Sequence, residues 1–468
     1  MRTRPCYWRL VALAGAFTLG TGLAAPACSQ ALTERLLGTI ELKGGAARGQ
    51  VISRRGDQIA LRERVDGGER YVTLAGPGET FDRLLNSAVW IEKRLVYYAV
   101  KGQQTILVDG ARRTVLKGTP TSPAVIGRLW PSADHRHYLA FVSDGKSVGW
   151  YTDGLLQPTK LDKLALVQIQ APASVPLFAG AKGCDWRLVG HAPSAAARWD
   201  LLHWVRTSND GSAVYVYGTR AGLALLQRNG VTLHQGVIDN FSTSADGKTW
   251  MAVADRSANG VDRVELLRNG LVVDSAETDL TRQQLALSAD GSTWVWQIID
   301  ADYLGASFRQ PGKPDRPIDV ETLEWYLSGD GKNVAVVQRS KVELGRVEVD
   351  VAGQRIGPLA DLRRRSFQFG AGSTFSFVRF DGKQRAVVSH LGDGPAFDDV
   401  SEVLMFPDGR PAYVGYRGPQ AYAVVGTVEL SLPADNVHHV NSLRIEGGSL
   451  RVLATRGSSV VDFSVSAN

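Results

Sequence analysis

The chain has 468 residues, 44% of them hydrophobic and 21% charged, a balance typical of globular proteins that excludes a largely disordered chain. The first 31 residues hold three of the 53 Lys and Arg and none of the 47 Asp and Glu, so the remainder carries a formal charge of only +3. This small excess does not favour nucleic-acid binding. Three cysteines are too few to stabilise a chain of this length by disulfides.

The N-terminal segment has the pattern of a secretory signal peptide. Arg2, Arg4 and Arg9 precede an apolar stretch over residues 10–23, which is too short to span a membrane, and the small residues "APA" follow at 25–27. We expect residues 1–31 to be a signal, with cleavage after Ala27 or Ala31, and a periplasmic or secreted protein. No later stretch is long and apolar enough for a membrane span.

Cys28 would become the N-terminal residue if cleavage followed Ala27. Lipidation of Cys28 would then anchor the protein, but a bacterial lipobox normally has Leu three residues before the cysteine, where this chain has Ala25. Plain secretion is therefore favoured over a lipid anchor.

One short motif recurs along the chain after the predicted signal. It reads "TSNDGSAVYVY" from 207, "TSADGKTWMAVA" from 243, "LSADGSTWVWQ" from 287, "LSGDGKNVAVVQ" from 327 and "MFPDGRPAYVGY" from 405, with a degraded copy, "FGAGSTFSFVRF", from 369. The spacing predicts a repeat of about 40 residues. The Asp-Gly pairs, which we predict to be structural turn residues, are Asp210, Gly211, Asp246, Gly247, Asp290, Gly291, Asp330, Gly331, Asp408 and Gly409.

Each repeat is predicted to hold four short antiparallel strands. A second turn, Asn-Gly or Asp-Gly, recurs in strings such as "ALLQRNGVTL" from 224 and "ELLRNGLVV" from 265, and these dipeptides favour two-residue hairpins. The strand after each S-x-D-G turn is apolar on both faces, which indicates burial on both sides. A four-stranded unit covered by neighbours on both faces is a blade of a β-propeller, so the fold class is all-β.

The S-x-D-G strings resemble the WD40-like β-propeller repeats of the TolB type, which are common in secreted bacterial proteins. The resemblance covers most of the chain after residue 85 and is best over 204–426. It implies a fold and says little about function. The Pro of the usual S-P-D-G string survives only in "FPDG" at 406–409.

Counting degraded copies gives about ten blades. Because rings usually have four to eight blades, we expect two propellers of five or six blades, an N-terminal one over 32–235 with degenerate repeats and a C-terminal one over 236–468. The alternative is one ring of seven or eight blades with irregular N-terminal strands.

The repeated aspartates are interpreted as turn residues whose carboxylates accept backbone N–H groups. Five equivalent residues in five blades cannot all face one active site. The functional alternative is the Asp box of sialidases, S-x-D-x-G-x-T-W, but "SADGSTW" is one residue short between Asp and Gly.

Other candidate chemistry is sparse. The sequence contains no H-E-x-x-H, P-loop, G-x-S-x-G or C-x-x-C motif. His135 and His137 are predicted on one strand face, where they could bind a metal, whereas His438 and His439 would point to opposite faces. For both pairs a polar feature at a strand end is the favoured interpretation, so we predict no catalytic, metal or cofactor-binding residues.

Two further features are interpreted as structural. Cys184 is predicted in a strand connection, as a bystander or as a disulfide partner of Cys28 rather than a reactive thiol. The run "RRR" at 363–365 is interpreted as a solvated loop rather than a phosphate reader.

These features favour a non-enzymatic binding or scaffold protein of the bacterial cell envelope that presents its blade loops to a protein or glycan partner. The alternative is a glycan-active hydrolase or lyase whose site is assembled at the propeller funnel from several blades.

Overall fold

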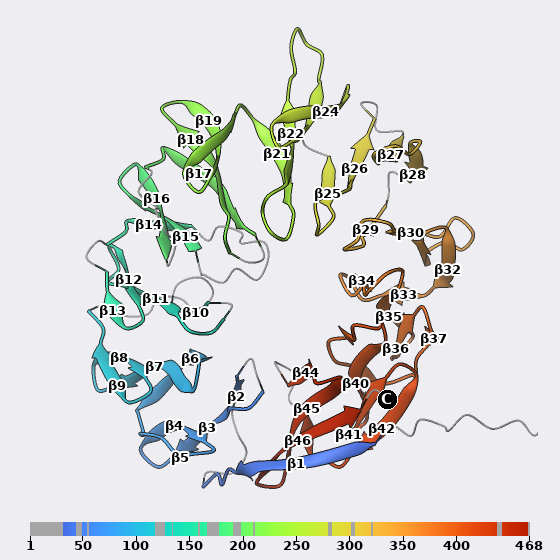
Figure 1. Cartoon of the computed structure of the whole chain (residues 1–468). Helices are drawn as coiled ribbons and strands as arrows, with labels where there is room; N and C mark the ends of the chain where they lie inside the picture. Colours follow the sequence, from blue (N-terminus) through green and yellow to red (C-terminus); the bar gives the residue numbers. More distant parts are fainter. Residues whose placement is uncertain are drawn as a thin grey trace, which may run out of the picture.

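The protein is an all-β ring of eleven sheets in the part of the chain that the structure describes (Figure 1). Most sheets contain four antiparallel strands, and we number these blades I to XI in chain order. The computed structural model describes residues 31–43, 49–53, 56–117, 127–132, 134–157, 160–165, 177–190, 198–208, 211–278, 283–300, 305–319, 322–437 and 442–466.

The strands of the first six blades follow one another without exchange between sheets. They are β2 (Gly49–Ile52), β3 (Ile59–Val65), β4 (Gly68–Thr73) and β5 (Gly76–Pro77) in blade I; β6 (Arg83–Ile91), β7 (Arg94–Lys101), β8 (Gln104–Asp109) and β9 (Arg112–Val115) in II; β10 (Leu129–Pro131), β11 (Tyr138–Ser143), β12 (Val148–Thr152) and β13 (Leu155–Leu156) in III; β14 (Lys163–Ala165), β15 (Leu177–Lys182) and β16 (Asp185–Gly190) in IV; β17 (Leu201–Thr207), β18 (Val214–Arg220), β19 (Leu223–Arg228) and β20 (Val231–Gln235) in V; and β21 (Ile238–Thr243), β22 (Trp250–Asp255), β23 (Val264–Arg268) and β24 (Leu271–Ala276) in VI.

The remaining five blades include three whose innermost strand is broken in two. They contain β25 (Gln284–Leu287), β26 (Trp294–Ile299), β27 (Ala306–Arg309) and β28 (Arg316–Ile318) in VII; β29 (Glu324–Leu327), β30 (Val334–Arg339), β31 (Val347–Val351) and β32 (Gln354–Leu359) in VIII; β33 (Asp361–Leu362), β34 (Gln368–Phe369), β35 (Phe375–Asp381), β36 (Gln384–Ser389) and β37 (Gly392–Asp393) in IX; β38 (Asp399–Val400), β39 (Leu404–Met405), β40 (Pro411–Arg417), β41 (Gln420–Val425) and β42 (Val428–Leu432) in X; and β43 (Asn436–Val437), β44 (Leu443–Glu446), β45 (Ser449–Arg456), β46 (Ser459–Ser466) and β1 (Leu32–Thr39) in XI.

The strand that follows each repeated turn is buried on both faces, as its apolar sequence predicts. In β22 and β26 five of the six residues are buried, and in β30 four of the six are. The outermost strand β24 is exposed or half-buried along its whole length. Burial therefore decreases outward across the blade.

The apolar core is divided among the blade interfaces. Each of the eleven buried clusters in the described structure draws its residues from two adjacent blades, and together they cover every interface around the ring. Trp294 and Trp296 of blade VII, for example, pack with Met251 of blade VI. The cluster that joins the last blade to the first contains Ile59 and Leu453.

The number of blades and the number of rings differ from our expectation. The described residues form one ring of eleven blades (Figure 1), so both two propellers of five or six blades and one ring of seven or eight are wrong. The boundary that we expected between the two propellers, after residue 235, follows the last strand of blade V, β20. Blades V and VI pack directly against each other there, in the same way as other neighbouring blades. The spacing of the repeats indicates roughly how many blades there are. It does not show which two blades meet to close the ring, because strands that are apolar on both faces can pack against a neighbour on either side.

The ring closes through the N-terminal strand. β1 pairs antiparallel with β46, from Leu32 opposite Val465 to Thr39 opposite Ser459, so blade XI combines both ends of the described chain. The fourth strand of the last blade is thus supplied by the segment that directly follows the predicted signal peptide.

A buried carboxylate lies at this closure. Asp462 of β46 is fully buried and forms ion pairs with Arg35 of β1, at 3.1 Å, with Arg444 of β44, at 2.9 Å, and with Arg451 of β45. One charge therefore links four strands. In the described part of the chain, no helix has the length and apolar character needed to cross a membrane.

Replacing Asp462 should weaken the ring at its closure. Asp462→Ala leaves three arginines without their buried counter-charge, and breaking a buried ion pair in this way costs about 3–5 kcal/mol of unfolding free energy. Urea denaturation should show this loss. Glu446→Ala is the control, because Glu446 contacts Arg444 at 3.4 Å but its side chain is 68% exposed, and we expect a loss of about 1 kcal/mol or less. Equal losses in the two variants would contradict the assigned role of Asp462.

Candidate functional site

The repeated turns join the innermost strand of a blade to the second strand. In blades VI, VII and VIII, a serine Oγ donates to the aspartate Oδ1 at 2.6–2.7 Å, and the same Oδ1 accepts a backbone N–H two residues later. The serine Oγ also accepts the N–H of the residue directly before the next strand, at 2.9–3.0 Å. The aspartates that make these contacts are Asp246, Asp290 and Asp330.

The other two copies are less complete. Asp408 accepts the N–H of Arg410 at 3.0 Å and pairs with its guanidinium, but Phe406 stands where the other turns have serine. Asp210 lies outside the described residues. The turn glycines Gly211, Gly247, Gly291, Gly331 and Gly409 all have positive φ, from 62° to 90°.

Neighbouring turns contact one another along one face of the ring. The N–H of Ala245 donates to the carbonyl of Ala289 at 2.7 Å, and the N–H of Ala289 donates to that of Gly329 at 3.0 Å. A Cβ on Gly291 would lie 3.2 Å from the Cβ of Ser244 in the preceding turn. The described turn aspartates thus lie in four different blades, VI, VII, VIII and X, and do not gather at one point.

A further copy of the turn escaped the sequence search because its glycine is replaced. In "SADH" at 132–135, Ser132 Oγ donates to Asp134 Oδ1 at 2.5 Å and accepts the N–H of His137 at 3.0 Å. His135 occupies the glycine position, with φ +55°. The pattern S-x-D followed by any residue would have found it.

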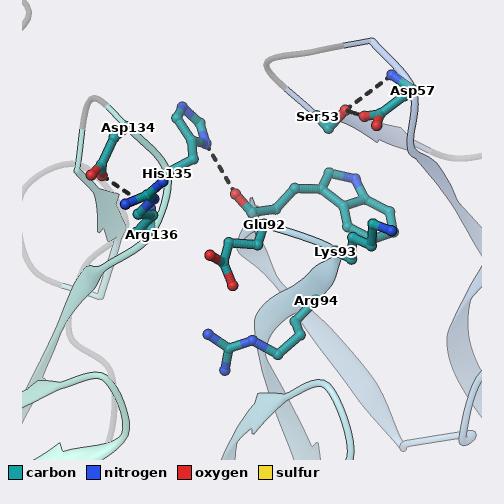
Figure 2. A pocket seen from close by; sticks show the side chains of 9 residues that line it. Ser53, Asp57, Glu92, Lys93, Arg94, Asp134, His135 and Arg136 are labelled. Carbon is teal, nitrogen blue, oxygen red and sulfur yellow. Dashed lines mark hydrogen bonds between the residues drawn. The ribbon is translucent and has the colours of Figure 1, made fainter.

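This turn helps to form a recess of about 400 Å³, which is our candidate functional site (Figure 2). Three consecutive blades contribute their turns after the innermost strands β2, β6 and β10. The residues that line it are Ser53, Asp57, Trp90, Glu92, Lys93, Arg94, Asp134, His135 and Arg136.

Backbone and ring hydrogen bonds fix the geometry between blades II and III. The N–H of Glu92 donates to the carbonyl of His135 at 2.8 Å, and His135 Nδ1 lies 3.0 Å from the carbonyl oxygen of Trp90. Because a carbonyl oxygen can only accept, Nδ1 carries the proton, and Nε2 of the neutral ring keeps its lone pair. Glu92, like His135, has positive φ, at +53°.

Charged side chains of both signs surround the recess. Asp57 accepts from Ser53 Oγ at 2.8 Å, and Arg94 pairs with the buried Asp109 at 2.6 Å. Burial would raise the pKa of Asp134, but hydrogen bonds from Ser132 Oγ and a backbone N–H lower it below its usual value.

Three more charged side chains around the recess have no partner among the residues that the structure describes. Glu92, Lys93 and Arg136 are exposed, and none of them has a side-chain hydrogen bond or ion pair within the described structure. In Figure 2 the Glu92 side chain lies between the 134–136 turn and Arg94. These three groups are thus available to a ligand.

The remaining sequence candidates lie elsewhere. His135 and His137 are in the turn before β11 and not on a strand face, because the S-x-D turn bends the chain there; His137 Nδ1 pairs with Asp153 at 2.8 Å. Cys184 is exposed and free in the β15–β16 turn. Cys28, His438 and His439 lie outside the described residues. Within the part described, no group of three His, Cys, Asp or Glu residues could hold a metal ion.

Comparisons with known proteins identify no family. No family model and no curated protein matches the sequence. A solved structure titled as a eukaryotic initiation factor is 10% identical, with a TM-score of 0.42, and the match covers 80% of this chain and 96% of that one. The β-propeller domain of the Trilobed protease from Pyrococcus furiosus is 12% identical, with a TM-score of 0.32, and covers 58% of this chain and 97% of its own. The β-propeller domain of Cps50 (Swd1) from Myceliophteria thermophila is 11% identical, with a TM-score of 0.26 and coverages of 56% and 95%. Sequence identities and TM-scores this low do not indicate a function for the chain.

We predict that Asp290→Ala lowers the thermal midpoint of unfolding at pH 7 by a few degrees and removes no activity selectively. Hydrogen bonds from Ser288 Oγ and the Ser292 N–H hold the pKa of Asp290 at about 2, below its unfolded value. Their stabilisation is therefore complete above the unfolded pKa of about 3.9 and is lost as the pH falls toward 2. The midpoints of wild type and variant, measured by circular dichroism from pH 7 to pH 2, should converge. A variant with an unchanged midpoint that has lost binding would overturn the turn role.

Positive φ at His135 gives a second prediction. His135→Gly and His135→Ala both lose the hydrogen bond to Trp90, but only glycine adopts this φ without strain. The glycine variant should therefore be more stable than the alanine variant by about 1 kcal/mol. Chemical denaturation of the two proteins measures the difference, and an alanine variant of equal or greater stability would show that the turn is not strained.

Proposed function

We propose that this protein is a binding or scaffold β-propeller of the TolB type in the bacterial cell envelope, and that it holds its partner at the recess of blades I to III. The eleven-blade ring supplies a rigid frame on which the turns of neighbouring blades converge, and such frames commonly carry binding sites on their loops. The fold alone does not specify the partner, and the recess supplies the groups that would contact it.

The observation that carries the proposal is the set of unpaired charges at the recess. Glu92, Lys93 and Arg136 are exposed side chains without partners in the described structure, although many other charged residues of the ring are paired. Unpaired charges of both signs within one concave site give specificity for a partner with the complementary arrangement.

His135 supports the same assignment. Five other turns have glycine at this position, whereas this turn keeps a histidine in a conformation that costs a non-glycine residue about 1 kcal/mol or more. Strained residues of this kind concentrate at functional sites. The histidine side chain lines the recess, so a contact made by its free Nε2 explains the substitution.

The chemistry of the recess favours a protein partner over a glycan. Lys93, Arg94 and Arg136 supply positive charge, and Asp57, Glu92 and Asp134 supply negative charge, which suits a peptide segment with side chains of both signs. Trp90, which a sugar ring could stack on, is only 4% exposed, and its indole N–H donates to the Val51 carbonyl.

Location in the envelope is the part of the proposal that depends on the signal-like residues 1–31. The three arginines and the apolar stretch support export to the periplasm or beyond. Lipidation of Cys28 remains the less favoured variant of the same proposal.

A glycan hydrolase or lyase is the alternative function. One observation favours it: the Nδ1–H of His135 is held by a carbonyl, so Nε2 is free to act as a general base beside the unpaired Glu92. Turnover of a glycan substrate that His135→Gly abolishes would establish this function in place of binding.

Capture from a cell-envelope extract tests the binding proposal. The wild-type protein should retain a partner, and a variant with Glu92→Gln, Lys93→Gln and Arg136→Gln should bind that partner about tenfold more weakly or worse, since three charge contacts are lost. Affinity is measured with the purified partner.

The matched control carries Arg220→Gln, Glu277→Gln and Lys313→Gln. These residues are also exposed and unpaired in the described structure, but they lie in blades V to VII, outside the recess. The control should bind as the wild type does. Equal binding by both triple variants would remove the recess from the proposed interface.

A further inference from the structure

A second recess, of about 430 Å³, lies between blades IX and X, and blade XI alone separates blade X from blade I, which lines the first recess. It forms where the innermost strands of both blades are broken. β33 and β34 both pair with β35, and β38 and β39 both pair with β40, which leaves 363–367 and 401–403 as irregular segments between them.

The run Arg363, Arg364 and Arg365 lies on the first of these segments and lines the recess. All three side chains are exposed. The Arg363 guanidinium reaches the carbonyl of Val400 in blade X at 3.4 Å, so it spans the two blades. Arg365 has a φ of +58°. The run is therefore part of a concave site and not only a solvated loop.

The backbone at Arg365 is held in place from blade VIII. Its N–H donates to Glu324 Oε2 at 3.1 Å, and the same oxygen accepts the Tyr326 hydroxyl at 2.5 Å. The Glu324 carboxylate is thus bound to a backbone N–H and a phenol, and the described structure holds no ion pair between it and the three guanidinium groups.

The other arginines of these two blades show what is unusual about the run. Each of them has a carboxylate partner: Arg379 with Asp393, Arg385 with Asp399, Arg410 with Asp408, and Arg417 with Glu429. Among the described residues, Arg363, Arg364 and Arg365 have no such partner. Three positive charges therefore converge on one recess with a single lining carboxylate, Glu402, beside them.

The polar groups of the recess leave hydrogen-bond donors free. Ser366 Oγ accepts the Val378 N–H at 3.0 Å, so its own proton remains available. Gln368 Nε2 is already used, donating to Ser376 Oγ and to the Val403 carbonyl. Guanidinium N–H groups together with a serine hydroxyl form the donor set that binds phosphate oxygens.

We propose that this recess binds the phosphate group of a small organic phosphate. The guanidinium groups of 363–365 would supply the charge and the paired N–H donors, and Ser366 would supply a hydroxyl. The volume of the recess falls in the range of sites that enclose small organic molecules, which favours a phosphate monoester over the free ion.

Isothermal titration at fixed ionic strength with glucose 6-phosphate, glucose and inorganic phosphate tests the proposal. We expect glucose 6-phosphate to bind, glucose not to bind, and inorganic phosphate to bind more weakly than the ester. Arg364→Gln should weaken binding of the ester about tenfold or more, as loss of a charge-assisted hydrogen bond does. Arg364 is exposed, so thermal unfolding should not change.

Arg220→Gln is the matched control, because Arg220 is an exposed arginine without a carboxylate partner in the described structure but lies outside the recess. It should bind the ester as the wild type does. No binding of the ester by the wild type, or an equal loss in Arg220→Gln and Arg364→Gln, would overturn the site. Inorganic phosphate binding as tightly as the ester would overturn the assignment to an organic phosphate.

Discussion

Each blade of this protein has two apolar faces, and neither face can be buried without a neighbouring blade. This constraint makes the ring the smallest arrangement that hides the core, because the eleven buried clusters are all shared between adjacent blades. A chain of blades with free ends would expose two such faces. The pairing of β1 with β46, and the burial of Asp462 among arginines of β1, β44 and β45, remove these ends.

Closure of the ring also positions the candidate functional surface. Once neighbouring blades are packed face to face, their first turns lie side by side, and backbone N–H groups of one turn bond to carbonyls of the next. Between blades VI, VII and VIII the turns meet through the small residues Ala245, Ala289 and Gly329. Between blades II and III the corresponding contact joins Glu92 to His135. The packing of these two turns therefore holds a carboxylate and an imidazole at the recess. The two recesses therefore arise from departures from the repeat and not from the repeat itself.

Much of the fold could be predicted from local chemistry. Both-face apolar strands such as 250–255 and 294–299 are buried as expected, and Asn269-Gly270 forms a hairpin with positive φ at both residues. The number of blades was harder to predict from the sequence, because degraded copies such as "SADH" lack the glycine that marks the turn. The candidate site was not predicted, since Ser53, Glu92 and Arg136 are far apart in sequence and belong to no common motif.

The sequence by itself determined the four-stranded antiparallel blade, since turn chemistry and side-chain alternation act over a few neighbouring residues. Only the tertiary structure decided that eleven blades share one ring, that the strand after the predicted signal completes the last blade, and that Arg363, Arg364 and Arg365 line a recess without a carboxylate partner in the described structure. These features depend on contacts between residues up to several hundred positions apart, such as Arg35 and Asp462, and no local pattern specifies such contacts.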